Sequence, residues 1–175
     1  MTRILQIVLL VAAILGSDLP RALAAGPEDL PFQLSSSLPR GVLNVFERDA
    51  SAKRYTLVAH LNPFYVNGDF NGDGRTDTAV LIKDVVSGKT GIAIVHGGTK
   101  SVVVLGAGRK FGNGGDDFRW MDAWHLYSKG PVQRGADETA PPTLKGDALM
   151  VIKTESASAL IYWNRKGYGW YQQGD

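Results

Sequence analysis

The chain of 175 residues has no cysteine, and that absence removes several classes of protein at once. Without cysteine there is no disulfide framework, no thiolate zinc site, no cysteine nucleophile and no lipid-modified cysteine. The chain also lacks an excess of charge of one sign, because 19 Lys and Arg against 17 Asp and Glu leave a net charge of +2. So small a charge is not that of a dedicated nucleic-acid-binding protein. A hydrophobic content of 44% excludes a chain that is disordered throughout.

Long hydrophobic runs are scarce, and the main one lies at the N-terminus, over residues 4–15. Arg3 precedes it, and Ala22 and Ala24 flank a single leucine after it, which is typical of a signal peptidase site. The run is too short to span a bilayer. We therefore expect residues 1–24 to be a secretory signal peptide, the alternative being an anchor that is never cut. The processed protein should be periplasmic or secreted, with no membrane span after cleavage.

The remaining sequence divides into a short arm and one domain. Residues 25–40 are rich in Pro and Ser and predict an extended arm or linker. Residues 41–175 should form a single β-rich domain. It begins with a short helix over 41–52, because Val42, Val45 and Phe46 follow helical spacing.

Short apolar, β-branched runs separated by Gly-containing turns predict strands over most of this domain. They cover residues 55–61, 78–83, 90–96, 101–105, 147–154, 157–163 and 168–172. The expected fold class is mainly β: an antiparallel meander or sheet of six to seven strands with one short N-terminal helix. Residues 129–145 carry three prolines and predict an exposed excursion. Residues 77–83 and 147–153 resemble each other weakly.

Residues 69–77 place oxygen-bearing side chains at alternate positions of a Gly-rich turn. The expected metal ligands are the side chains of Asp69, Asn71, Asp73 and Asp77 and the backbone carbonyl of Arg75. Hard divalent cations prefer such oxygen ligands, and Ca²⁺ is available outside cells. The glycines at 72 and 74 permit the left-handed backbone that so tight a turn needs. The alternative is a polar turn that binds nothing.

This spacing does not make an EF-hand. Counted from Asp69, the twelfth position holds Val80 where an EF-hand needs a bidentate Glu, and a strand rather than a helix should follow. The segment 68–82 instead resembles the calcium loops of the FG-GAP and VCBS type, which precede strands in β-propeller blades. That resemblance implies Ca²⁺ as the cofactor. The chain is also similar to small exported bacterial proteins of unknown function with one such loop.

A second segment, residues 116–125, concentrates acidic and aromatic side chains. Asp117, Asp122 and His125 lie close to Trp120 and Trp124. A carboxylate pair beside aromatic rings would suit a hydrolase acting on an envelope carbohydrate. The alternative is that the tryptophans belong to the core and the charged neighbours to the surface.

The sequence favours a protein without catalytic activity over an enzyme. The three histidines lack zinc-site spacing, and no Gly-x-Ser-x-Gly motif is present. We expect an exported domain that binds one structural Ca²⁺ and has a binding or structural role in the cell envelope. Its partner would be a protein or a glycan. The carbohydrate-active hydrolase is the alternative.

Overall fold

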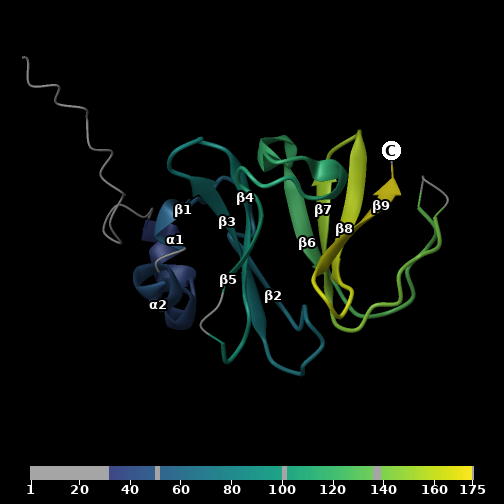
Figure 1. The fold of residues 1–175 in the computed structure, drawn as a ribbon, viewed down its shortest axis with the longest axis horizontal. Helices are drawn as coiled ribbons and strands as arrows, with labels where there is room; N and C mark the ends of the chain where they lie inside the picture. The colour runs from purple at the N-terminus through teal and green to yellow at the C-terminus, as the bar shows by residue number, and fades with distance from the viewer. Residues whose placement is uncertain (1–31, 50–51, 100–101, 136–138, 175) are drawn as a thin grey trace, which may run out of the picture.

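The computed structural model describes residues 32–49, 52–99, 102–135 and 139–174 (Figure 1). The expected signal peptide, 1–24, and the first part of the expected arm lie outside these residues. The described part of the chain holds nine strands in two antiparallel sheets, two α-helices and three short 3₁₀ helices. The mainly β prediction is therefore confirmed, with more strands than expected. None of the described helices is long and apolar enough to cross a bilayer.

The first sheet is organised around its longest strand, β3. Strand β4 pairs with one edge of β3, and β5 pairs with β4. The other edge of β3 is shared by two shorter strands, because β2 pairs with its beginning and β1 with its end. The strands are β1 (Tyr55–Leu57), β2 (Tyr65–Gly68), β3 (Asp77–Asp84), β4 (Thr90–Val95) and β5 (Val102–Gly106).

The second sheet is a meander of four strands in sequence order. They are β6 (Ala123–Tyr127), β7 (Ala148–Lys153), β8 (Ala157–Trp163) and β9 (Tyr168–Gly174). Strands β2 to β5 form the same kind of meander in the first sheet. Each half of the chain thus builds one four-stranded antiparallel unit, and β3 and β7 hold equivalent places.

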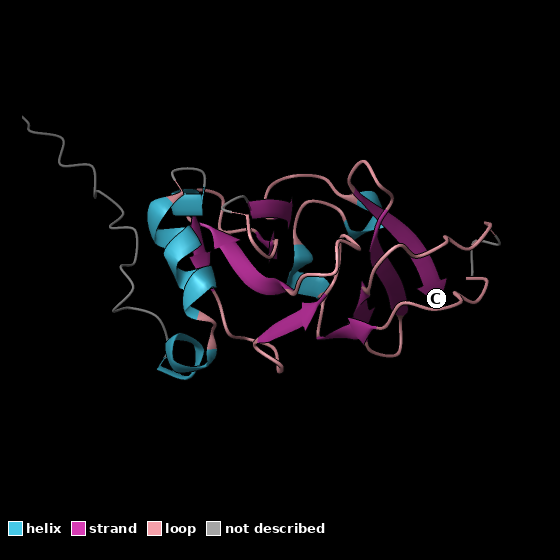
Figure 2. Ribbon diagram, turned by 90° about the horizontal axis from the view of Figure 1, so that it is seen from below, coloured by secondary structure: helices cyan, strands magenta, loops and turns pink. Residues whose placement is uncertain are grey.

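Four layers follow one another across the molecule: helices, first sheet, second sheet and the excursion between β6 and β7 (Figures 1 and 2). The main core lies between the sheets. Ala79, Leu81 and Ile92 contribute to it from the first sheet, and Leu149 and Val151 from the second. Two smaller cores lie on the outer faces, one under the helices and one under the excursion.

Strand β3 is buried on both faces, which explains its unbroken apolar run. Side chains alternate between the two faces of a strand. Ala79 and Leu81 point into the core between the sheets, whereas Val80 and Ile82 point toward the helices. A strand covered on both sides needs apolar residues at every position.

The N-terminal segment differs from its prediction. Helix α2 (Arg40–Arg48) confirms the expected helix but ends four residues before the predicted boundary. Helix α1 (Phe32–Ser37) occupies most of the described part of the segment predicted to be extended, so that prediction is wrong over 32–37. Leu34 and Leu38 lie one helical turn apart and are buried on the outer face of the first sheet. Helical backbone places both side chains on the side that faces the sheet.

All seven predicted strands are present, and two more were missed. Strand β2 is short and contains Asn67 and a terminal glycine, which weaken the strand pattern. Strand β6 carries His125 on an exposed position and shows no clear alternation. The division of the strands into two facing sheets also goes beyond what the strand predictions state.

Candidate functional site

The loop between β2 and β3 lies where the two sheets meet, and its backbone folds around the side chain of Asp69. One carboxylate oxygen of Asp69, Oδ1, accepts hydrogen bonds from the backbone N–H groups of Gly72 (2.8 Å) and Asp73 (2.9 Å). The other, Oδ2, accepts from the N–H of Gly74 at 2.9 Å. Gly72 and Gly74 both have positive φ, as the sequence predicts.

Asn71 and Asp73 complete the outer side of this loop. The Oδ1 of Asn71 accepts a hydrogen bond from the N–H of Asp73 at 2.9 Å, so the oxygens of Asp69 and Asn71 converge on the same amide. The Nδ2 of Asn71 donates to the Oδ2 of Asp73 at 3.1 Å. The pKa of Asp73 is lowered, first by the hydrogen bond from the N–H of Arg75 and then by that from Asn71. Three oxygen-bearing side chains thus gather within one turn of the chain.

Asp77 lies on the inner side of the loop and is fully buried. Its Oδ2 accepts from the N–H groups of Phe70 (3.0 Å) and Asn71 (3.3 Å), and its Oδ1 accepts from the N–H of Gly97 (2.7 Å). These bonds tie the loop to the turn after β4. Asp77 therefore anchors the loop from within, whereas Asp73 is exposed to solvent.

The expected ligands are thus brought together in part. Asp69, Asn71 and Asp73 lie within one turn, Arg75 follows them on the surface, and Asp77 faces the interior. Across residues 32–49, 52–99, 102–135 and 139–174, no group of three or more His, Cys, Asp and Glu side chains is placed to hold a metal ion. Carboxylates alone do not form a centre here, so an ion would also need amide and carbonyl oxygens.

Asp147 is part of this site and was not predicted as such. Its Oδ2 accepts a hydrogen bond from the N–H of Asp69 at 2.9 Å, and its own N–H donates to the carbonyl oxygen of Asp69 at 2.7 Å. Its Oδ1 accepts from the N–H of Lys129 at 2.9 Å. Asp147 precedes β7 as Asp77 begins β3, so the weak resemblance of 147–153 to 77–83 was the signal that could have identified it.

A buried polar cluster lies directly behind the loop. The Nδ1 of His96 is 3.3 Å from the Oδ2 of Asp77 but makes no hydrogen bond with suitable geometry. The Nε2 of His96 is 3.4 Å from the hydroxyl of Tyr168, and the Trp163 ring packs edge-on against His96. Burial raises the pKa of Tyr168, and the negative charges of Asp77 and Asp69 raise it further. The cluster joins β4 to the β8–β9 turn, which belongs to the second sheet.

The acidic residues of segment 116–125 do not converge. Asp116 pairs with Lys89, Asp117 accepts from the backbone and side chain of Thr90, and Asp122 accepts from Thr154. Burial would raise the pKa of Asp117, but its hydrogen bonds outweigh this and lower the pKa overall. The pKa of Asp122 is lowered mainly by the N–H of Thr154. Neither carboxyl has the raised pKa of a general acid.

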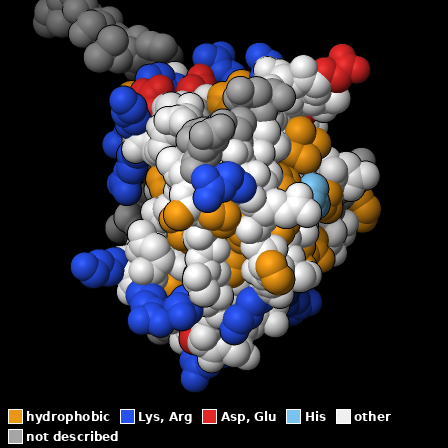
Figure 3. Space-filling model, turned by 90° about the vertical axis from the view of Figure 1, so that its right-hand side faces the viewer, with side chains coloured by type: hydrophobic (Ala, Val, Ile, Leu, Met, Phe, Trp, Pro, Cys, Tyr) orange, Lys and Arg blue, Asp and Glu red, His pale blue; other side chains and the backbone are white. Residues whose placement is uncertain are grey.

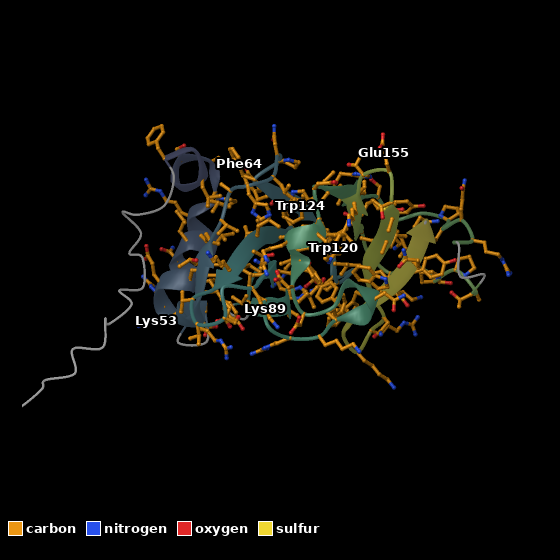
Figure 4. All side chains as sticks on the ribbon, turned by 90° about the horizontal axis from the view of Figure 1, so that it is seen from above. Lys53, Phe64, Lys89, Trp120, Trp124 and Glu155 are labelled. Atoms are coloured by element: carbon orange, nitrogen blue, oxygen red, sulfur yellow. The ribbon has the colours of Figure 1, made fainter. Side chains whose placement is uncertain are left out.

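The aromatic residues of the same segment belong to the core. Trp124 is 2% exposed and Trp120 packs against the same cluster between the sheets (Figure 4). The Nε1 of Trp124 donates to the carbonyl oxygen of Pro63, and that of Trp120 donates to the carbonyl oxygen of Gly114. The carboxylates and rings of the alternative hydrolytic site therefore do not form one shared site; each has its own hydrogen-bond or packing partner.

The outer face of the second sheet carries a pocket away from the loop. An open pocket of about 450 Å³ lies between the two limbs of the excursion. Its lining consists of Lys129, Gly130, Pro131, Val132, Pro141, Pro142, Thr143 and Leu144. Figure 3 shows this side of the molecule, where hydrophobic side chains lie across the middle and toward the right, and most Lys and Arg side chains lie toward the left and lower edges. Backbone groups of the 69–77 loop reach the same excursion through Asp147.

Comparison with known proteins gives no relative: no protein-family model, no curated protein and no solved structure matches the chain.

Proposed function

We propose that the chain is an exported protein without catalytic activity, in which the loop 69–77 binds one Ca²⁺ ion. The observation that carries this proposal is the convergence of Asp69, Asn71 and Asp73 within a single turn, with oxygens of the first two on one amide. A turn held in that conformation before the ion arrives spares part of the ordering cost of binding.

The chemistry of the available donors suits calcium. Every side-chain donor is a carboxylate or amide oxygen, and Ca²⁺ takes about six to eight oxygen ligands. Asp69, Asn71 and Asp73 would bind with their side chains and Arg75 with its carbonyl, and water would complete the set. Asp77 is proposed as the innermost member, which both fixes the loop and adds negative charge. A bound cation would relieve the repulsion between three carboxylates placed so closely.

The ion would stabilise the junction of the two sheets. The loop is bonded to the β4–β5 turn through Asp77 and to the excursion through Asp147. An ion that fixes the loop therefore also restrains both neighbours. The remaining surface would be free to bind a protein or glycan in the cell envelope, and the separate structural roles of Asp116, Asp117 and Asp122 support a role without catalysis.

Calorimetric titration with Ca²⁺ tests the proposal. We expect saturable binding at one site by a chain that starts at Ala25 and so contains every described residue. Asp73→Ala should abolish this binding, because it removes a proposed ligand. The variant should still fold, because the Asp73 side chain is exposed and its loss leaves the buried anchors intact. Asp116→Ala removes one carboxylate at the other end of the molecule and should bind as the parent does. No heat of binding in the parent protein would reduce the loop to a polar turn.

The melting temperature gives a second readout of the same proposal. Binding to the native state stabilises it by about 2.7 kcal/mol when free Ca²⁺ is one hundred times the dissociation constant. The parent protein should therefore melt at a higher temperature in Ca²⁺ than in EDTA. The Asp73→Ala variant should melt at one temperature in both. Equal melting of the parent protein in the two buffers would contradict a structural role for the ion.

A further inference from the structure

The turn between β3 and β4 presents two adjacent valines to solvent. Val85 is 38% exposed and Val86 is 83% exposed. The turn is nevertheless well fixed, because the carboxylate of Asp84 accepts hydrogen bonds from the N–H groups of Val86 (2.8 Å) and Ser87 (3.0 Å). The N–H of Val85 donates to the carbonyl oxygen of Arg54. The fold therefore holds an apolar tip rigidly in water, and nothing in the described part of the chain packs over Val86.

Exposed cations surround this tip. The side chain of Lys83 reaches the turn, since its Cε would lie 3.8 Å from a Cβ placed on Gly88. A Cβ on Gly108 would lie within 4.0 Å of Ser87, Asp84 and Arg54, so residues 107–110 lie beside the same turn. Four exposed cations lie on or next to the segments that border this turn and form no ion pair within the described residues: Lys53, Lys83, Arg109 and Lys110.

The acidic residues nearby do not cancel this charge. Asp84 is paired with Arg54 and Asp116 with Lys89, so these four residues contribute no net charge. Asp117, which accepts from Thr90 beside Lys89, is paired with Arg119. Asp49, whose carbonyl oxygen accepts from the N–H of Lys53, is a further acid near this surface. Figure 4 views the molecule from this end, with Lys53 and Lys89 on one side and Glu155 on the other. We call the surface formed by Val85, Val86, Lys53, Lys83, Arg109 and Lys110 the valine-tip surface.

We propose that the valine-tip surface docks on an anionic lipid bilayer. Apolar side chains that enter the headgroup region and basic side chains that meet lipid phosphates are the two parts of peripheral membrane binding. Long Lys and Arg side chains can extend their charged ends to the headgroups beside an inserted tip. An anionic polymer would use the cations but has no need of the valines, so the combination favours a bilayer.

Co-sedimentation with lipid vesicles tests this proposal. The chain starting at Ala25 should bind vesicles that contain phosphatidylglycerol, bind pure phosphatidylcholine vesicles much less, and lose binding as salt rises. Val86→Ser removes the tip without changing charge and should weaken binding about tenfold. Because Val86 is so exposed, the fold should tolerate this change, and an unchanged melting temperature checks that it does.

A matched pair of charge reversals locates the surface. Arg109→Glu with Lys110→Glu should weaken vesicle binding by about tenfold or more. Arg165→Glu with Lys166→Glu changes the net charge equally, in the exposed turn at the opposite end, and should have little effect. Asp73→Ala should also bind vesicles as the parent does, which separates this proposal from the calcium site.

Three outcomes would overturn the proposal. Equal binding to neutral and anionic vesicles would show that the Lys and Arg side chains of this surface do not recognise anionic lipid. Unchanged binding by Val86→Ser, with retention on a polyanion column, would assign the surface to an anionic polymer. A loss confined to the Arg165 and Lys166 pair would place docking at the opposite end.

Discussion

Asp69 and Asp147 bind each other through their backbones and one side chain, across the junction of the two sheets. The N–H of Asp147 donates to the carbonyl oxygen of Asp69, and the carboxylate of Asp147 accepts from the N–H of Asp69. Each residue precedes a strand of a different sheet. The loop proposed to bind calcium is thus shaped by residues from both halves of the chain.

Removal of the Asp147 side chain should loosen this junction. Asp147→Ala leaves the N–H groups of Asp69 and Lys129 without their acceptor, and we expect a loss of about 1–3 kcal/mol in the free energy of unfolding. Denaturant unfolding measures the loss, and amide hydrogen exchange at Asp69 and Lys129 should speed up. Asp122→Ala is the matched control, because that carboxylate also caps a backbone N–H, that of Thr154, but does so on the surface. An equal loss of unfolding free energy in both variants would show that Asp147 stabilises the protein no more than a carboxylate cap on the surface does.

Asn71→Asp should act in opposite directions with and without calcium. The added charge should tighten Ca²⁺ binding by about tenfold, since ligand charge tunes the affinity of such loops. In EDTA the new carboxylate would face Asp73 at the distance now bridged by a hydrogen bond, and the melting temperature should fall. Titration and melting measure the two effects. A melting temperature that shifts in the same direction in Ca²⁺ and in EDTA would count against Asn71 as a calcium ligand.

Gly72 and Gly74 offer a comparison of strain with crowding. Both have positive φ, but a Cβ on Gly72 would lie 2.6 Å from the carbonyl oxygen of Lys145, whereas one on Gly74 meets nothing within 4 Å. Gly74→Ala should cost about 1 kcal/mol for the left-handed backbone. Gly72→Ala should cost about 1–3 kcal/mol more, because the backbone must shift. Denaturant unfolding of the pair decides this, and equal losses would mean that the loop moves away from the excursion easily.

Asp84 should contribute to the loss of stability in acid. Burial alone would raise its pKa, but hydrogen bonds from Ser87, Val86 and Arg54 outweigh burial and lower the pKa overall. A carboxyl with a lowered pKa in the folded state stabilises the protein above the unfolded value of about 4. That contribution is lost as the pH falls from there through the folded value.

The variant Asp84→Asn should therefore show a weaker dependence of stability on pH in this acid range. The slope should fall by up to about 1.4 kcal/mol per pH unit, which corresponds to one proton. Urea unfolding at a series of pH values measures it. Asp116→Asn removes one carboxylate from the same end of the molecule as a control. A change of slope as large in the control would contradict the assignment to Asp84.

The strands were predictable where local pattern and burial agree. Strand β3 reads as a strand because both of its faces are covered, so that every position from Ala79 to Ile82 is apolar. Helix α1 was not predictable in this way, because its serine-rich sequence favours turns. The helical structure depends on burial of Leu34 and Leu38 against a sheet that lies later in the chain. Tertiary contacts outweigh local preference there.

The candidate site also combines features that local sequence predicts with features that depend on distant contacts. The oxygen-bearing residues of the loop follow from spacing, and the left-handed glycines follow from the tightness of the turn. The orientation of Asp77 toward the interior depends on Gly97, which a local motif does not contain. The contribution of Asp147 depends on a contact between residues 78 positions apart. The resemblance between the segments that begin at Asp77 and Asp147 marked an equivalent position but not that contact.

The same separation along the chain sets an order in time. Because a chain is synthesised from its N-terminus, β2 and β3 are complete well before Asp147 is added. The backbone lock on Asp69 closes only when the second half of the chain has arrived, although the loop residues themselves have long been present. An ion that needs the finished loop would thus bind only after both sheets are in place.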